Sequence, residues 1–263
     1  MRTASARLAA ISAVVLTALA AAPAQSTQTA PAQAPPAAQA LPTAKELIAR
    51  HVKAIGGREA VFAYSSRRAT GTMSIPASGM EGSLELYMAK PNKSLMRINL
   101  PGVGSMEEGF DGTHGWSINP VTGPSLLQGK QLEDRREESE FGAELTLEKN
   151  YTDMKTVERA DFDGRPCYKV VATRKVGGED TIYFDVATGL RAGSVGTRET
   201  PMGPITATTV ETDYKQFGKV MYPTRLKIST MGIDQLMTLT TIEHDTVDPS
   251  VFAIPAPIKA LIK

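Results

Sequence analysis

The chain has 263 residues, a formal net charge of +1 and one cysteine, Cys167. This near-neutral charge balance gives no electrostatic basis for binding nucleic acid or an anionic membrane surface. A single cysteine excludes an intrachain disulfide and a thiolate metal site, so the fold must depend on its own apolar core. Cys167 lies in an apolar strand pattern, which predicts a buried packing role.

Residues 1–24 have the pattern of a cleaved secretory signal peptide. Arg2 and Arg7 precede an apolar run from Leu8 to Ala22, and Ala22-Pro23-Ala24 fits the small-residue cleavage rule. The apolar run is shorter than the roughly 20 residues of a membrane span. We therefore predict export to the periplasm; an uncleaved N-terminal anchor is the alternative.

Residues 25–42 are rich in Ala, Pro and Gln and carry no charge, which predicts a disordered tether. Thr43-Ala-Lys-Glu46 is a capping box, and it predicts the start of a helix at 43–56. The Gly56-Gly57 pair supplies the left-handed residues that end such a helix. No domain boundary is evident after this point, so 43–263 is predicted to be one domain.

From about Ser66 the hydrophobic period changes to two, which indicates strands with one apolar and one polar face. Strands are predicted at about 66–76, 79–90, 93–100, 103–111, 114–118, 153–161, 165–175, 179–186, 189–199, 205–217, 219–230 and 233–246. Short strands at regular spacing with hairpin turns favour a mainly β (α+β) fold with a single large antiparallel sheet of about 11–12 strands, curled or closed.

The stretch Glu107–Pro124 contains the only tryptophan, Trp116, and one of three histidines. Phe110-Asp111-Gly112-Thr113 is predicted to be a tight hairpin turn, because Asp-Gly favours a primed turn. Asp111 and His114 are then corner residues and no catalytic pair. Residues 120–124 are predicted to turn the chain toward the next helix.

The charged segment 129–141 is predicted to be a helix, either solvated on the surface or acting as a lid. The acidic pairs Glu107-Glu108 and Glu137-Glu138 are interpreted as solvated surface charge.

The sequence contains no HExxH, CxxC, GxSxG or Walker-type motif, and no base or orienting acid can be identified for a serine nucleophile. Glu243-His244-Asp245 is the best metal candidate, but adjacent strand residues point to opposite faces and do not converge on one ion. We therefore predict no catalytic residue, no metal and no cofactor.

Eleven methionines are spread through the chain, and several occupy apolar positions of the strand alternation. Methionine is flexible and lines surfaces that accept variable apolar shapes, so a curled sheet could hold an alkyl chain. The alternative is that these methionines fill an irregular core.

The sequence resembles the LolA-like family of periplasmic outer-membrane lipoprotein-sorting proteins. The resemblance covers most of 43–255 and is carried by the order and spacing of several segments. These segments are AIGG, RRATGTMSIP, LELYMAKPNKSLMRINLPGVGSMEEGFDGTHGWSINPVTGP, FDGRPCYKVV, YFDVATGLRAG, DYKQFGKVMYPTRLKI and IEHDTVDPSVFAIPAP. The chain is longer than a minimal member, with a tether and extra strands.

This resemblance implies an incompletely closed β-barrel with helices 43–56 and 129–141 as lids over an apolar cavity. It implies a monomeric periplasmic carrier without catalysis, which binds lipoprotein acyl chains or another lipid and meets inner- and outer-membrane partner proteins transiently. The alternatives are an envelope-stress sensor of the RseB type and an envelope hydrolase. The candidate cavity residues are Met73, Ile75, Leu84, Leu86, Met88, Met96, Ile98 and Trp116.

Overall fold

The computed structural model describes residues 40–200 and 203–262. The predicted signal peptide and residues 25–39 of the predicted tether lie outside these residues. Ala40–Lys263 form one compact unit. Among the described residues, none of the helices has the length and apolar character needed to cross a membrane.

The described chain contains short helices and long strands. The helices are α1 (Ala44–Ala54), α2 (Arg58–Phe62), α3 (Gly129–Glu138) and α4 (Ala256–Lys259), with 3-10 turns η1 (Pro76–Ser78), η2 (Ala143–Leu145), η3 (Leu147–Asn150) and η4 (Pro249–Phe252). The strands are β1 (Ser66–Ile75), β2 (Met80–Ala89), β3 (Lys93–Leu100), β4 (Gly104–Phe110), β5 (Gly115–Asn119), β6 (Gly123–Leu126), β7 (Tyr151–Phe162), β8 (Arg165–Arg174), β9 (Glu179–Asp185), β10 (Arg191–Thr200), β11 (Gly203–Phe217), β12 (Val220–Thr230) and β13 (Ile233–His244).

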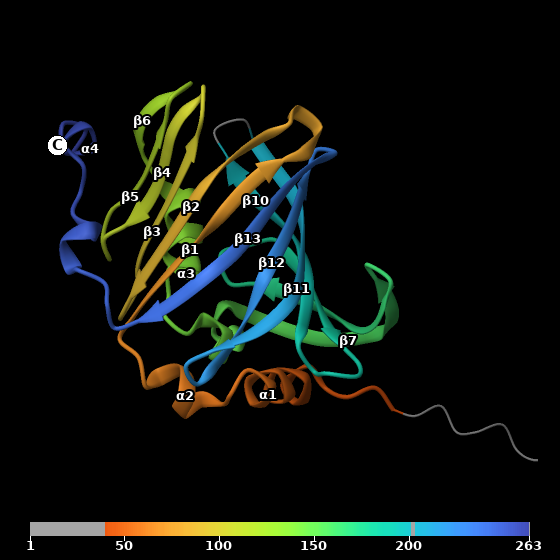
Figure 1. The fold of residues 1–263 in the computed structure, drawn as a ribbon. Coiled ribbons are helices and arrows are strands. Elements are labelled where there is room, and N and C mark those ends of the chain that lie inside the picture. Colours follow the sequence, from red (N-terminus) through yellow and green to blue (C-terminus); the bar gives the residue numbers. More distant parts are fainter. Residues whose placement is uncertain (1–39, 201–202, 263) are drawn as a thin grey trace, which may run out of the picture. The chain divides into compact units, whose positions relative to one another are not determined.

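All the strands belong to one antiparallel sheet in the order β6-β5-β4-β3-β2-β1-β13-β12-β11-β10-β9-β8-β7. The predicted mainly β fold with a single curled antiparallel sheet is confirmed. The sheet is not closed, because β6 and β7 are its two edges. The segment 127–150, which contains α3, joins these edges. Figure 1 shows α1 and α2 at the same end of the curled sheet.

The sheet has 13 strands, one more than the twelve predicted, and the difference is β6. This strand has four residues, and its Pro124 lies opposite Ile118 of β5. Proline cannot donate to a ladder and is confined to edge strands, where β6 lies. Its turn-like composition therefore hid it: the predicted turn is present at 120–122, but residues 123–124 begin β6.

The start of the first helix follows the predicted capping box. Thr43 Oγ1 accepts a hydrogen bond from the Glu46 amide at 3.2 Å, and the Thr43 amide donates to Glu46 Oε2 at 2.7 Å. Gly56 and Gly57 have φ of 115° and 89°, so they turn the chain out of α1. A Cβ on Gly56 would lie 2.4 Å from the Lys219 carbonyl oxygen, which requires glycine there. The short helix α2 was not predicted.

The alternation of the first strands gives two faces. On the concave face the register pairs Leu84 with Ile98 and Leu86 with Met96. A core cluster on this face contains Met73, Leu84 and Ile98. A second core cluster packs α1 against β8 and β9. Cys167 is fully buried, as the strand pattern predicted.

The opposite face carries the third core cluster. Trp116 is fully buried there and packs with Leu95, Phe252 and Ile258, so the C-terminal segment of η4 and α4 covers it. Trp116 pairs with Gly109 across the β4–β5 ladder. A Cβ on Gly109 would lie 2.2 Å from the Trp116 ring, so glycine makes room for the indole.

The hairpin between β4 and β5 has a four-residue loop, 111–114, one residue later than the predicted 110–113 turn. The Asp111 carboxylate accepts hydrogen bonds from the amides of Thr113 and His114 at 2.8 and 2.7 Å. These bonds replace the compact primed turn, because an aspartate side chain can satisfy loop amides itself. Asp111 acts at this corner as a loop-closing residue.

Candidate functional site

A cavity of about 320 Å³ lies on the concave face of the sheet. This volume is near the lower end of the range for small-molecule sites, about 300–1,000 Å³. The lining comes from α1, α3, η2 and strands of both halves of the sheet, the first half being β1–β6 and the second half β7–β13. The lining residues are His51, Ile55, Arg67, Ala69, Leu86, Tyr87, Met88, Ser94, Leu95, Met96, Arg135, Glu138, Glu144, Arg191, Glu211, Tyr214, Met221, Tyr222, Pro223, Leu226, Met237, Leu239 and Ile242.

The apolar wall of the cavity follows the register of the central strands. Ala69 of β1 lies opposite Leu86 on one side and Ile242 on the other. Leu86 in turn lies opposite Met96 of β3. Because Ala69 is small and its neighbours include unbranched methionines, the wall is apolar and able to change shape.

The structure divides the candidate cavity residues into three groups. Leu86, Met88 and Met96 line the cavity. Met73, Leu84 and Ile98 lie on the same face but are buried inside the core cluster, against which Ile75 packs. Trp116 lies on the opposite face under the C-terminal segment and does not line the cavity. Whether the lining residues contact a ligand stays a prediction.

The polar end of the cavity contains a tightly paired arginine. Arg191 binds Glu211 through two contacts, 2.6 Å from Nη2 and 3.0 Å from Nε. The Tyr214 hydroxyl donates to the same carboxylate at 2.8 Å. Burial raises the pKa of Tyr214 well above its usual range, and the Glu211 carboxylate raises it further, so the phenol stays protonated. This cluster is internally satisfied.

His51 of α1 also faces this end. Its Nδ1 accepts a hydrogen bond from the Arg191 backbone amide at 3.1 Å, and the ring packs against Phe184. Burial lowers the pKa of His51 to about 3, and the positive charge of Arg191 acts in the same direction. The imidazole is therefore neutral near pH 7 and anchors α1 to β10.

A second arginine at this end is paired far more loosely. Arg67 Nη1 lies 3.9 Å from Glu144 Oε1, and its Nη2 lies 2.8 Å from the sulfur of Met88. The guanidinium also stacks over the Tyr222 ring at 4.8 Å. A thioether sulfur is a weak acceptor, so Arg67 keeps donor capacity toward the cavity.

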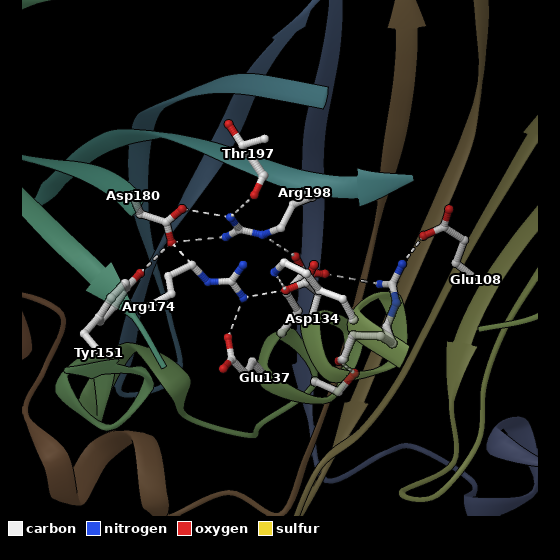
Figure 2. A network of polar contacts seen from close by, with 12 residues as sticks. Glu108, Asp134, Glu137, Tyr151, Arg174, Asp180, Thr197 and Arg198 are labelled. Atoms are coloured by element: carbon white, nitrogen blue, oxygen red, sulfur yellow. Dashed lines mark hydrogen bonds and ion pairs between the residues drawn. The ribbon is translucent and has the colours of Figure 1, made fainter. Parts of the chain in front are cut away.

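A network of ion pairs holds the helix α3 against the concave face of the curled sheet (Figure 2). Arg174 of β8 donates to Asp134 at 2.7 Å and to Glu137 at 2.6 Å. Arg198 of β10 donates to Asp180 at 2.8 Å, and Asp180 also lies 3.7 Å from Arg174. The network therefore ties α3 to two strands of the second half of the sheet.

On its other side, α3 contacts the first half of the sheet through an ion pair between Arg135 and Glu108 of β4. Asp134 is only 4% exposed. The helix is therefore only partly solvated: Asp134 is buried, whereas Glu133, Arg136 and Glu138 are exposed. The interpretation of the acidic pairs as solvated charge was wrong for Glu107 and Glu137, which are 17% and 19% exposed, whereas Glu108 and Glu138 keep 37% and 47% exposure in ion pairs. Asp134, Glu137 and Glu138 of α3 have arginine partners because the helix lies against the concave face of the sheet.

Sequence reasoning missed the polar residues of the cavity. Arg67 is a charged residue at a position of β1 that faces the cavity, where the alternation of the strand predicts an apolar residue. Glu144, Arg191 and Glu211 come from separate elements, and only the fold brings them together. A charged residue in phase with the apolar face of a strand is the one signal that could have identified Arg67.

Two other places are candidates for binding sites: a hollow beside α1 and the predicted metal candidate around His244. A larger, more open hollow of about 690 Å³ lies between α1 and β7, and Lys45, Glu148 and Asp153 contribute to its lining. Within the described ranges, no group of three or more metal-ligating side chains comes together. His244 instead stacks on Tyr64 with ring centres 3.8 Å apart.

Comparisons with known proteins place the fold. Neither protein-family models nor curated protein sequences give a match to this chain. Solved structures do resemble it. A DUF1329 family protein from Desulfovibrio piger is 13% identical with a TM-score of 0.56, over 80% of this chain and 96% of its own.

Two further solved structures have sorting-protein names. A LolA superfamily protein from Nitrosomonas europaea is 12% identical, with a TM-score of 0.53 over 81% of this chain and 99% of its own. A putative outer membrane lipoprotein-sorting protein domain from Vibrio parahaemolyticus is 13% identical, with a TM-score of 0.54 over 79% and 94%. At this identity the likeness concerns the fold, and it confirms the family resemblance at that level. The chain therefore has the fold of LolA superfamily and DUF1329 proteins.

Proposed function

We propose that this protein is a periplasmic carrier that holds lipid acyl chains in the cavity on the concave face of its sheet. The observation that carries the proposal is the apolar wall of Leu86, Met96, Met237, Leu239 and Ile242 around a hollow of about 320 Å³. An apolar hollow with a small polar end is the usual form of a site for an amphiphilic ligand. The LolA-type fold supports the same function by analogy.

The physical driving force is removal of the acyl chain from water. Each buried CH₂ contributes roughly 0.8 kcal/mol, so a few methylenes already give measurable affinity. The flexible methionines allow chains of different shape to bind without a rigid fit. A carrier needs such a surface because it must release its cargo as well as bind it.

We propose binding without catalysis. A general base requires an accessible group that can take a proton from a substrate. His51 uses its Nδ1 to accept the Arg191 amide, and Glu211 is bound by Arg191 and Tyr214. These groups are engaged in holding the cavity together. We further propose that the protein is a monomer in the periplasm and meets membrane partner proteins only while it loads or releases cargo.

The proposal is tested with a pair of tryptophan variants on one strand. Met237→Trp places an indole inside the cavity, whereas Ile233→Trp places one on a residue of β13 that is 49% exposed and outside the lining. The protein is exported and purified without detergent, and native mass spectrometry measures co-purified lipid. Titration with an uncharged fluorescent naphthylamine dye measures occupancy of the cavity.

We expect wild type and Ile233→Trp to carry lipid and to bind the dye, and Met237→Trp to lose both while its melting temperature stays close to wild type. If the purified wild-type protein carries no lipid and does not bind the dye, the proposed carrier function is contradicted. Equal binding by both variants shows that the ligand lies elsewhere.

A further inference from the structure

The charged residues that line the cavity balance one another. The lining contains three arginines, Arg67, Arg135 and Arg191, and three glutamates, Glu138, Glu144 and Glu211. His51 adds no charge near pH 7, because burial lowers its pKa to about 3. Including Glu108, which binds Arg135 from β4, adds one more negative charge. The polar end therefore holds no excess positive charge that would attract an anionic head group.

Within this balanced set, two ion pairs are longer than a hydrogen bond: Arg67–Glu144 at 3.9 Å and Arg135–Glu138 at 3.8 Å. Arg135 is also bound by Glu108, and Glu138 also lies 3.4 Å from Arg198, so Arg67–Glu144 is the more open of the two pairs. The two oxygen contacts of Arg191 with Glu211 are 2.6 and 3.0 Å long, whereas Arg67 and Glu144 are 3.9 Å apart. The side chains of Arg67 and Glu144 are 22% and 23% exposed. Hydrogen bonds need donor–acceptor distances near 2.7–3.2 Å. Arg67 thus retains donors, and Glu144 retains an acceptor, toward the same space.

The register places an apolar path directly beside this pair. Arg67 lies opposite Met88, and the next inward residue of β1, Ala69, lies opposite Leu86 and Ile242. The next inward position, Gly71, lies opposite Leu239. A ligand with its polar head between Arg67 and Glu144 would therefore lay its chain over the aliphatic wall.

We propose that the cavity selects uncharged acyl esters that carry hydroxyl groups, of the acylglycerol type, over fatty acids and alkylamines. The Arg67 guanidinium donates to the ester carbonyl, and the Glu144 carboxylate accepts from a hydroxyl of the head group. This inference rests on the proposed carrier function and names the class of ligand.

The physical reason is the cost of an unbalanced charge in a half-buried site. A carboxylate head would bind Arg67 but would also face Glu144 at short range. A like charge nearby disfavours the ionised form of the head group, and each pKa unit of such a shift corresponds to a factor of ten. An ammonium head would face Arg67 in the same way. An uncharged ester with hydroxyls satisfies both side chains and adds no charge.

The experiment compares ligands of one chain length. Displacement of the uncharged dye is measured at pH 8, below the critical micelle concentration, with 1-monododecanoylglycerol, dodecanoate and dodecyltrimethylammonium. The variants are Glu144→Gln, which leaves Arg67 without its carboxylate, and Glu148→Gln as the matched control. Glu148 is exposed on η3 and does not line this cavity.

We expect wild type to bind the glyceride at least about tenfold more tightly than either charged ligand. Glu144→Gln is expected to raise the affinity for dodecanoate by on the order of tenfold, whereas Glu148→Gln leaves it unchanged. Wild type that binds dodecanoate as tightly as the glyceride, or Glu144→Gln without a gain, overturns the inference. If wild type binds the dye but this order of ligands fails, the carrier function stands; if no ligand binds, the carrier function itself fails.

Discussion

Two charged regions face the concave side of the sheet, and they differ in how completely their charges are paired. The α3 network joins Arg174 and Arg198 to three carboxylates at hydrogen-bond distance, and the Arg174 side chain is 2% exposed. The Arg67–Glu144 pair is longer, at 3.9 Å, and both side chains keep about a fifth of their surface open. In the first region Arg174 and Asp180 are enclosed by protein and Arg198 is 34% exposed, whereas the Arg67–Glu144 pair borders a hollow.

This difference suggests different roles: the α3 network stabilises the fold, and the Arg67–Glu144 pair is available to bind a ligand. The short ion pairs of the α3 network hold the helix in place, because a buried charge needs partners. Three buried atoms of the network, Asp134 Oδ2, Arg174 Nη1 and Arg198 Nε, nevertheless have no hydrogen-bond partner. A loosely paired charge beside a cavity can exchange its protein partner for a ligand group. Replacing residues of each kind should therefore affect stability in one region and binding in the other.

The largest effect is expected for Arg174→Met. The change leaves Asp134 and Glu137 without their shared arginine in a buried position, and breaking a buried pair in this way costs about 3–5 kcal/mol. Chemical denaturation of the wild type and the variant measures the loss in the free energy of unfolding.

The matched control is Lys149→Met, which removes an ion pair with Glu140 whose lysine side chain is 61% exposed. Exposed pairs contribute about 0–1 kcal/mol. A loss for Arg174→Met as small as that for Lys149→Met would show that the α3 network does not support the fold.

An intermediate effect is expected from His51 when the pH falls. The folded-state pKa of about 3 lies below the ordinary value of 6.5, so the unfolded chain binds a proton first. The contribution of neutral His51 is complete above pH 6.5 and declines as the pH falls toward 3. By pH 5 the loss is roughly 2 kcal/mol, at 1.36 kcal/mol for each pH unit.

Urea denaturation of wild type and His51→Gln at pH 7 and pH 5 isolates this contribution. Glutamine can still accept the Arg191 amide but does not titrate. The stability difference between the two proteins should shift by about 2 kcal/mol in favour of the variant at pH 5. Parallel pH profiles would mean that His51 is protonated, or exposed, in the folded protein.

The smallest effect on stability is expected for Arg67→Met. Its partner Glu144 is 3.9 Å away and partly exposed, so the loss should be below about 1 kcal/mol. Dye binding should persist because the apolar wall is intact, whereas the affinity for the glyceride should fall several-fold. A destabilisation similar to that of Arg174→Met would remove the distinction between the two regions.

Much of the sheet followed from local patterns. The two-residue alternation correctly placed Leu84, Leu86, Met96 and Ile98 on one face, because successive strand residues point to opposite sides. The strand β6 and the helix α2 were missed because four or five residues carry too little periodicity to be recognised.

The candidate site followed less completely from the sequence. Alternation assigns a face but does not distinguish the part of that face that is filled from the part that is hollow. Leu84 and Leu86 share a strand and a face, yet Leu84 is in the packed core and Leu86 borders the cavity. The curvature of the sheet makes this distinction, and no local pattern reports it.

The sequence by itself determined the antiparallel strands, their apolar faces and the capped first helix, because each depends on residues close together along the chain. Only the tertiary structure decided that α3 is held inside the curl, that Trp116 packs under the C-terminal segment, and that Arg67 meets Glu144 beside an apolar hollow. The physical reason is that burial and charge pairing depend on contacts between distant residues. Arg67 and Glu144 come from a strand and a 3-10 turn that are far apart in sequence, and the curled sheet makes them neighbours.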